Sequence, residues 1–124
     1  MKCMKILLVG CLAWCLSWTA AQAMSVERVG ADLYATGPTV STDFVTFKAA
    51  FAQEGIERLI LVNGPGGDLW TGMQVARMVQ AQGIQTVASG SCVSACSLIF
   101  IAGKKRAFGT GHLPVSYTHL TLPT

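Results

Sequence analysis

The 124-residue chain has few charged residues, and this shortage excludes several classes of protein. Asp, Glu, Lys and Arg together make up 12% of the sequence, about half the usual share, whereas apolar residues make up 52%. A disordered chain or a coiled coil would contain many more charged residues. The basic excess is small, with nine Lys and Arg against six Asp and Glu, and residues 104–106 form the one basic cluster, which we expect in a solvated turn. Nucleic-acid binding, which needs clustered basic side chains, is therefore not expected.

The sequence also lacks the short motifs of common nucleotide, metal and hydrolase sites. It contains no G-x-G-x-x-G or Walker pattern for phosphates and no G-x-S-x-G elbow of the α/β-hydrolases. No second pair of ligands accompanies its cysteines, as a zinc site would need. We therefore expect neither a metal nor any other cofactor, and the length allows one small domain.

The first 23 residues have the pattern of a secretory signal peptide. Lys2 and Lys5 precede an uncharged run at residues 6–19, which is followed by Ala21-Gln22-Ala23. A basic start, an apolar run shorter than the roughly 20 residues of a membrane span, and small residues before the cleavage point are typical of such signals. We expect a periplasmic or secreted protein whose mature chain begins at Met24.

Two alternatives remain open for this segment. If the signal is not cleaved, it serves as a membrane anchor, which is the one membrane contact that the sequence predicts. The residues Leu8-Val9-Gly10-Cys11 also have the form of a lipobox, although the apolar run continues beyond them.

Cleavage would remove three of the five cysteines and leave Cys92 and Cys96. An even number of cysteines in an oxidising compartment favours a disulfide. Their separation of four residues fits a disulfide only on irregular backbone, because the geometry of a regular helix is poor for it. A disulfide and two buried free thiols therefore both remain open.

Strand and helix patterns alternate along the mature chain. Strands are predicted where residues alternate loosely or form short apolar runs, at residues 26–33, 57–62, 84–88 and 106–108. Helices are predicted where residues recur at helical spacing, once at positions 44, 47, 50 and 51 and once at positions 69, 73, 76, 79 and 83. A third, very apolar helix is predicted at residues 94–102. The order β-α-β-α-β-α-β predicts an α/β fold with a mostly parallel sheet.

Two loops between these elements contain the candidate functional residues. The glycines of Asn63-Gly64-Pro65-Gly66-Gly67 leave backbone N–H groups open to a ligand, and this loop alone is compatible with a tight turn or a phosphate site. The second loop, residues 89–93, precedes an apolar helix that starts with Ser94. Ser94 is either a helix cap or a nucleophile whose oxyanion is stabilised by nearby N–H groups.

The two loops in this order resemble the proteolytic subunit of the Clp protease and the wider crotonase-like fold. The pattern of its secreted bacterial relatives, Asn-x-Pro-Gly-Gly, Cys-x-Ser-Ala-Cys and Ala-Gly, is matched by residues 63–67, 92–96 and 102–103. The resemblance implies repeated ββα units, a serine peptidase that takes an extended peptide, and frequent homo-oligomers. It also implies Ser94 as the nucleophile and the N–H groups of Gly67 and Ala95 as the oxyanion hole.

The remaining members of a catalytic triad are not evident. The resemblance places a histidine near positions 115–118 and an acid beyond the end of the chain, whereas the chain offers His112 and His119. A Ser-Lys dyad with Lys104 or Lys105 is an alternative, although both lysines are close to Ser94 in sequence.

Residues 114–124 do not fit the strand and loop that the resemblance requires there. The sequence Val-Ser-Tyr-Thr-His-Leu within them is one reading frame of a transposon-end sequencing adapter, so we expect a non-native tail. A genuine C-terminal tail is the alternative.

The sequence therefore predicts a fragment of a secreted serine peptidase, with a partial Clp-peptidase-like domain at residues 24–113. We expect this fragment to be inactive as it stands, because a base and an acid for Ser94 are not evident. The alternative is a non-catalytic envelope protein of the same fold, in which Ser94 is only a helix cap and the cysteine pair is structural.

Overall fold

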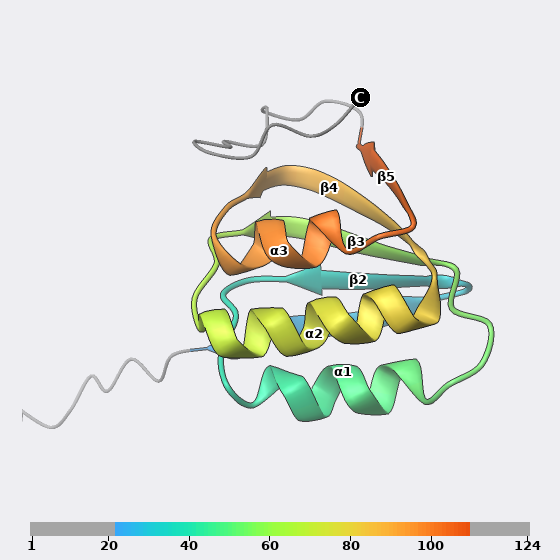
Figure 1. Ribbon diagram of the computed structural model, residues 1–124, viewed down its shortest axis with the longest axis horizontal. Helices are drawn as coiled ribbons and strands as arrows, with labels where there is room; N and C mark the ends of the chain where they lie inside the picture. The colour runs from blue at the N-terminus through green and yellow to red at the C-terminus, as the bar shows by residue number, and fades with distance from the viewer. Residues whose placement is uncertain (1–21, 110–124) are drawn as a thin grey trace, which may run out of the picture.

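The strands of the sheet follow one another in space as they do along the chain (Figure 1). The computed structural model describes residues 22–109. Its strands, in sheet order, are β1 (Ser25–Val29), β2 (Asp32–Thr36), β3 (Arg58–Gly64), β4 (Gln85–Cys92) and β5 (Lys105–Phe108). The helices between them are α1 (Asp43–Phe51), α2 (Leu69–Gln82) and α3 (Ala95–Ile101).

Within this sheet, one pair of strands is antiparallel and three pairs are parallel. β1 and β2 form an antiparallel hairpin, whereas β2 with β3, β3 with β4, and β4 with β5 are parallel. Each parallel pair is joined by a helix, because parallel strands need a crossover connection. The three helices run side by side over the sheet, α1 next to α2 and α2 next to α3 (Figure 1). The predicted α/β class with a mostly parallel sheet is confirmed.

The strand boundaries correct the sequence prediction in three places. The single strand expected over residues 26–33 is a hairpin, because Gly30 adopts a positive φ of 63° and turns the chain. Residues 89–92, expected in a loop, belong to β4, which pairs with β3 as far as Cys92. β5 begins at Lys105, one residue before the strand predicted at residues 106–108, so it includes part of the basic cluster that was expected in a turn.

The hydrophobic core lies between the sheet and the helices. Phe47 and Phe51, two of the residues whose spacing predicted α1, are buried and stack with ring centroids 5.9 Å apart. The sheet and the other two helices complete the core with fully buried apolar side chains, among them Leu33, Leu59, Leu61, Val75, Val79, Ile99 and Phe100.

The buried face of α2 differs from the predicted one. Helical spacing places Leu69 and Met73 on one face with Val79, but their exposed fractions are 54% and 38%, whereas Val79 is buried. The face of α2 that the structure buries carries Thr71, Gly72, Val75 and Val79. The cause is the close approach of α3, since a Cβ atom at Gly72 would lie 2.8 Å from the Cβ atom of Ala95.

Several sequence predictions fall outside the described residues. These are the signal peptide up to residue 21, His112, His119 and the adapter-like tail at residues 114–124. Between residues 22 and 109, the structure contains no helix of the length and apolar character that a bilayer crossing requires.

Candidate active site

Three connections meet at the edge of the sheet where the parallel strands end. β2, β3 and β4 are parallel, so the segments that follow them start at the same edge. Backbone hydrogen bonds join these segments, from Thr39 N–H to the Gly66 carbonyl (2.8 Å) and from Val93 N–H to the Gly64 carbonyl (3.0 Å). The two loops identified in the sequence are therefore neighbours.

Ser94 lies in the turn between β4 and α3, with a backbone conformation that is unusual for serine. Its φ is 54° and its ψ is −123°. A non-glycine residue in such a region costs on the order of 1–3 kcal/mol and is held there by the surrounding structure. The surrounding structure therefore fixes the direction of the Ser94 side chain.

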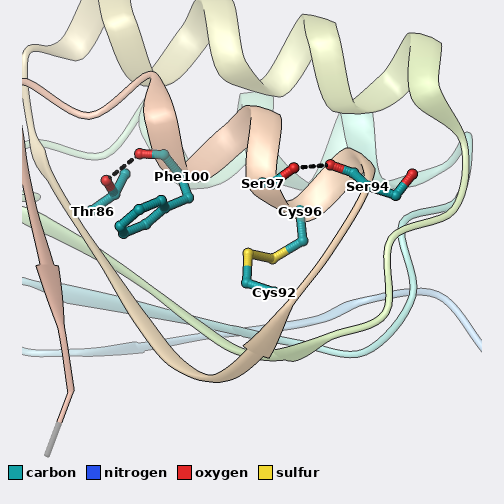
Figure 2. Close-up of a disulfide and its surroundings, with 6 residues drawn as sticks. All are labelled: Thr86, Cys92, Ser94, Cys96, Ser97 and Phe100. Carbon is teal, nitrogen blue, oxygen red and sulfur yellow. Dashed lines mark hydrogen bonds between the residues drawn. A yellow bond between two sulfur atoms is a disulfide. The ribbon is translucent and has the colours of Figure 1, made fainter. Parts of the chain in front are cut away.

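The hydroxyl of Ser94 is open to solvent. Ser94 stands at the N-cap position of α3, yet its exposed side chain makes no capping hydrogen bond. Figure 2 shows its hydroxyl directed away from the helix, while its carbonyl accepts a hydrogen bond from the Ser97 hydroxyl at 2.6 Å. The capping role that the sequence left open for the Ser94 side chain is thus absent from the structure.

The glycine-rich loop is in close contact with the Ser94 turn. A Cβ atom at Gly66 would lie 2.7 Å from the Cβ atom of Ser94 and 2.8 Å from the Val93 carbonyl oxygen. Gly66 and Gly67 both have positive φ values, 86° and 143°. Only glycine combines this backbone with this approach, so the loop can lie directly against the candidate nucleophile.

The two N–H groups predicted to form the oxyanion hole are unoccupied. Neither Gly67 nor Ala95 donates a backbone hydrogen bond to another residue in the described part of the chain. The N–H of Ala95 is the first of α3 and has no acceptor within its own helix. Both N–H groups therefore lack an acceptor among the described residues; Gly67 is exposed, whereas Ala95 is fully buried.

The direction of the Gly67 N–H is set by Thr39, which the sequence analysis did not identify. Thr39 forms a parallel bridge with Gly67: it donates to the Gly66 carbonyl and accepts from the Asp68 N–H, both at 2.8 Å. In this pairing the N–H of Gly67 itself points away from Thr39. The Thr39 hydroxyl is buried and has no hydrogen-bond partner among the described residues. No local pattern marks Thr39, because the bridge joins positions far apart in sequence.

Asp68 caps the helix that follows the glycine-rich loop. Its carboxylate accepts hydrogen bonds from the Thr71 hydroxyl and from the Thr71 N–H (3.0 Å). These bonds, the hydroxyl bond first, hold the pKa of Asp68 below its ordinary value. The cap thus fixes the start of α2 directly after Gly67.

We expect Asp68→Ala to lower the melting temperature at neutral pH by removing this cap. Because the pKa of the folded state is lowered, the carboxylate stabilises the protein above its ordinary pKa of about 4, and this contribution disappears as the pH falls through the lowered value. The difference in melting temperature between wild type and variant should therefore shrink on acidification. Thermal unfolding between pH 7 and pH 3 measures it, and a difference independent of pH would contradict the prediction.

Cys92 and Cys96 form a disulfide around the Ser94 turn, with their Cα atoms 5.2 Å apart (Figure 2). Both cysteines are fully buried. The irregular backbone that their spacing requires is supplied by Ser94, which lies midway between them. Of the two alternatives left open by the sequence, the structure has the disulfide.

The disulfide also accounts for the glycine at position 64. A Cβ atom at Gly64 would collide with the sulfur of Cys96 and lie 2.8 Å from its Cβ atom. The end of β3 therefore has no room for a side chain beside this disulfide.

Replacement of both cysteines by alanine should lower the free energy of unfolding by about 2 kcal/mol, the value expected for closing so short a loop. Denaturant unfolding of the oxidised wild type and of Cys92→Ala/Cys96→Ala measures the difference. Equal midpoints and slopes would show that the disulfide does not stabilise the fold.

The structure separates the candidate lysines from Ser94. Lys105 pairs with Gln85 at the start of β4, whereas the Ser94 turn follows Cys92 at its other end. Seven residues of strand span about 23 Å, so a Ser-Lys dyad with Lys104 or Lys105 is wrong.

Other groups that could form a site lie elsewhere or are missing from the described range. A cavity of about 310 Å³ lies at the lysine edge of the sheet, lined by Glu57, Arg58, Gly83, Gln85, Lys104 and Lys105. Residues 22–109 contain no cluster of side chains that could hold a metal ion. They also contain no histidine, so a histidine base for Ser94 is not found among them.

Comparison with known proteins supports the resemblance seen in the sequence. The sequence model of the family described as Clp protease matches residues 39–111, a range that starts at Thr39 and includes both loops of the site. No curated protein matches the chain.

In fold, the chain is similar to a putative enoyl-CoA hydratase from Streptomyces coelicolor A3(2), with a TM-score of 0.50 and 14% identity. The similarity covers 78% of this chain and 49% of that one, so the chain spans about half the length of this neighbour. At this identity the similarity concerns the fold alone. The predicted Clp-peptidase-like and crotonase-like resemblance is confirmed.

Proposed function

Because the chain belongs to the Clp protease family, we propose that it carries the nucleophile and the oxyanion hole of a serine peptidase. The observation that supports this most directly is the Ser94 turn, where an exposed hydroxyl lies beside the glycine-rich loop. The N–H groups of Gly67 and Ala95 have no acceptor among the described residues, as an oxyanion hole requires before substrate binds.

In the proposed reaction, the Ser94 Oγ atom attacks the carbonyl carbon of an extended peptide and passes its proton to a base. The N–H groups of Gly67 and Ala95 donate hydrogen bonds to the resulting oxyanion. The C–N bond then breaks, and the amine leaves with the proton from the base. Water attacks the acyl-serine by the same route, which releases the acid and restores Ser94. These steps need no metal and no cofactor.

The base is the part of the mechanism that residues 22–109 do not supply. We propose that it lies beyond residue 109, in a complete gene product in which the domain continues past residue 113. His112 and His119 lie outside the described residues. A serine hydroxyl without a base is almost wholly protonated at neutral pH, so the 124-residue chain alone should be nearly unreactive.

The proposed location is the bacterial periplasm or the exterior, after removal of residues 1–23. The buried Cys92–Cys96 disulfide supports this location, because disulfides persist in oxidising compartments. The proposed partner is an extended peptide, and the complete protein is proposed to form a homo-oligomer, as relatives of this fold often do.

A non-catalytic envelope protein of the same fold is the second candidate. The absence of histidine from residues 22–109 favours it, because the described chain offers Ser94 no imidazole base. In that protein the Ser94 turn would be only a structural connection between β4 and α3.

A fluorophosphonate probe distinguishes the two candidates. If the peptidase proposal is correct, the complete gene product reacts with the probe and mass spectrometry locates the adduct on Ser94, with fluoride as the leaving group. The 124-residue chain should react weakly or not at all. A complete gene product that folds but is never labelled would support the non-catalytic protein.

A further inference from the structure

Asp43 is a fully buried carboxylate that has no cation partner among the described residues. Its exposed fraction is 0%, and the one ion pair between residues 22 and 109 joins Arg58 to Asp32. Burial of a carboxylate is unfavourable unless hydrogen bonds or an opposite charge compensate for the lost hydration. The compensation for the lost hydration of Asp43 therefore comes from the groups that touch its two carboxylate oxygens.

Both oxygens of Asp43 accept hydrogen bonds from backbone nitrogens. Oδ2 accepts from the Val40 N–H at 2.7 Å, and Oδ1 accepts from the nitrogen of Met24 at 3.1 Å. Met24 is itself buried, with an exposed fraction of 5%, whereas Gln22 and Ala23 are exposed. The chain thus passes from the surface into the core at Met24.

This is also the position at which the signal sequence predicts cleavage. The residues Ala21-Gln22-Ala23 precede Met24 with small residues at the −3 and −1 positions. Cleavage hydrolyses the peptide bond between Ala23 and Met24, so that Ala23 leaves as a carboxylate and Met24 gains an α-amino group. That group is protonated at neutral pH and places a positive charge where Asp43 now accepts from an amide.

We propose that removal of residues 1–23 creates a buried ion pair between the α-ammonium of Met24 and the carboxylate of Asp43, which completes the folded state of the mature protein. The bond from the Met24 amide to the carboxylate is already charge-assisted, and cleavage adds to it the attraction between two opposite charges. The same carboxylate holds Val40, which follows Thr39, so the pair anchors the segment that bridges to Gly67.

The test compares two forms of the complete gene product that differ by one residue. The first begins at Met24, and the second retains Ala23, which keeps the Met24 nitrogen as an amide. We expect the ratio of folded to unfolded protein to be about 5- to 30-fold higher for the first form in denaturant titrations. Asp43→Asn should remove this difference, because the amide side chain that it introduces carries no charge. Equal stability of the two forms, or an undiminished difference between them when both carry Asp43→Asn, would overturn the proposal.

Two further measurements do not depend on the folding of the Asp43→Asn variant. N-terminal sequencing of the exported protein should give Met24 as the first residue, and another mature N-terminus would overturn the proposal. In the native protein, an amine-reactive acylating reagent should modify the Met24 α-amine at least about tenfold more slowly than the α-amine of the form that retains Ala23. Equal reactivity would show that the Met24 amine is not buried.

Discussion

Ser94→Ala in the complete gene product is expected to lower the rate of fluorophosphonate labelling at least about a thousandfold, to the level of background hydroxyls. The loss follows because no other described hydroxyl combines exposure with the contact to Gly66 that places it at the glycine-rich loop. The melting temperature should change little, because the Ser94 side chain is exposed and makes no capping hydrogen bond. The measurement is the second-order labelling rate, with circular dichroism to establish that the variant is folded.

The matched control for this variant is Ser91→Ala. Ser91 is an exposed serine in the same segment, within β4 rather than in the Ser94 turn, so its replacement should leave the labelling rate unchanged. Persistent labelling of Ser94→Ala, or an equal loss in Ser91→Ala, would show that the reactive group has been misidentified.

The parts of the fold that depend on local sequence could be predicted. The extent of α2 is one example, because residues at helical spacing from Leu69 to Gly83 predicted the helix that the structure places at Leu69–Gln82. Such spacing is a property of neighbouring residues, so it is visible in the sequence alone. The pairing of the two loops around Ser94 was also expected, but from the family resemblance rather than from the residues themselves.

The parts that depend on distant contacts could not be predicted from sequence patterns. Thr39 sets the direction of Gly67 across 28 positions of chain, and no periodicity records such a bridge. The exposure of Leu69 and Met73 follows from the approach of α3 at Gly72, which a helical pattern within α2 does not show. The choice between a disulfide and free thiols depended on the backbone at Ser94, whose positive φ is a feature of the folded chain.

The second large effect is expected for Gly66→Ala. The new methyl group would lie 2.7 Å from the Ser94 Cβ atom and 2.8 Å from the Val93 carbonyl oxygen, on a backbone with φ of 86°. Overpacking and the unfavourable φ each cost on the order of 1–3 kcal/mol, so the free energy of unfolding should fall by about 2–6 kcal/mol. Relief of the clash moves the loop away from Ser94 and takes the Gly67 N–H with it. Loss of one oxyanion donor lowers the rate about 100- to 1000-fold, which labelling of the folded fraction would detect.

Gly83→Ala serves as a control that separates the two causes of the destabilisation expected for Gly66→Ala, the steric clash and the unfavourable φ. Gly83 also has a positive φ, 64°, but a Cβ atom there would have no other atom within 4 Å. This variant should therefore lose only the conformational part, about 1–2 kcal/mol, and keep the wild-type labelling rate. Gly66→Ala should therefore lower both the free energy of unfolding and the labelling rate more than Gly83→Ala does. If the two variants behave alike, the contact between the glycine-rich loop and Ser94 does not control reactivity, and the oxyanion hole has to be formed by other groups.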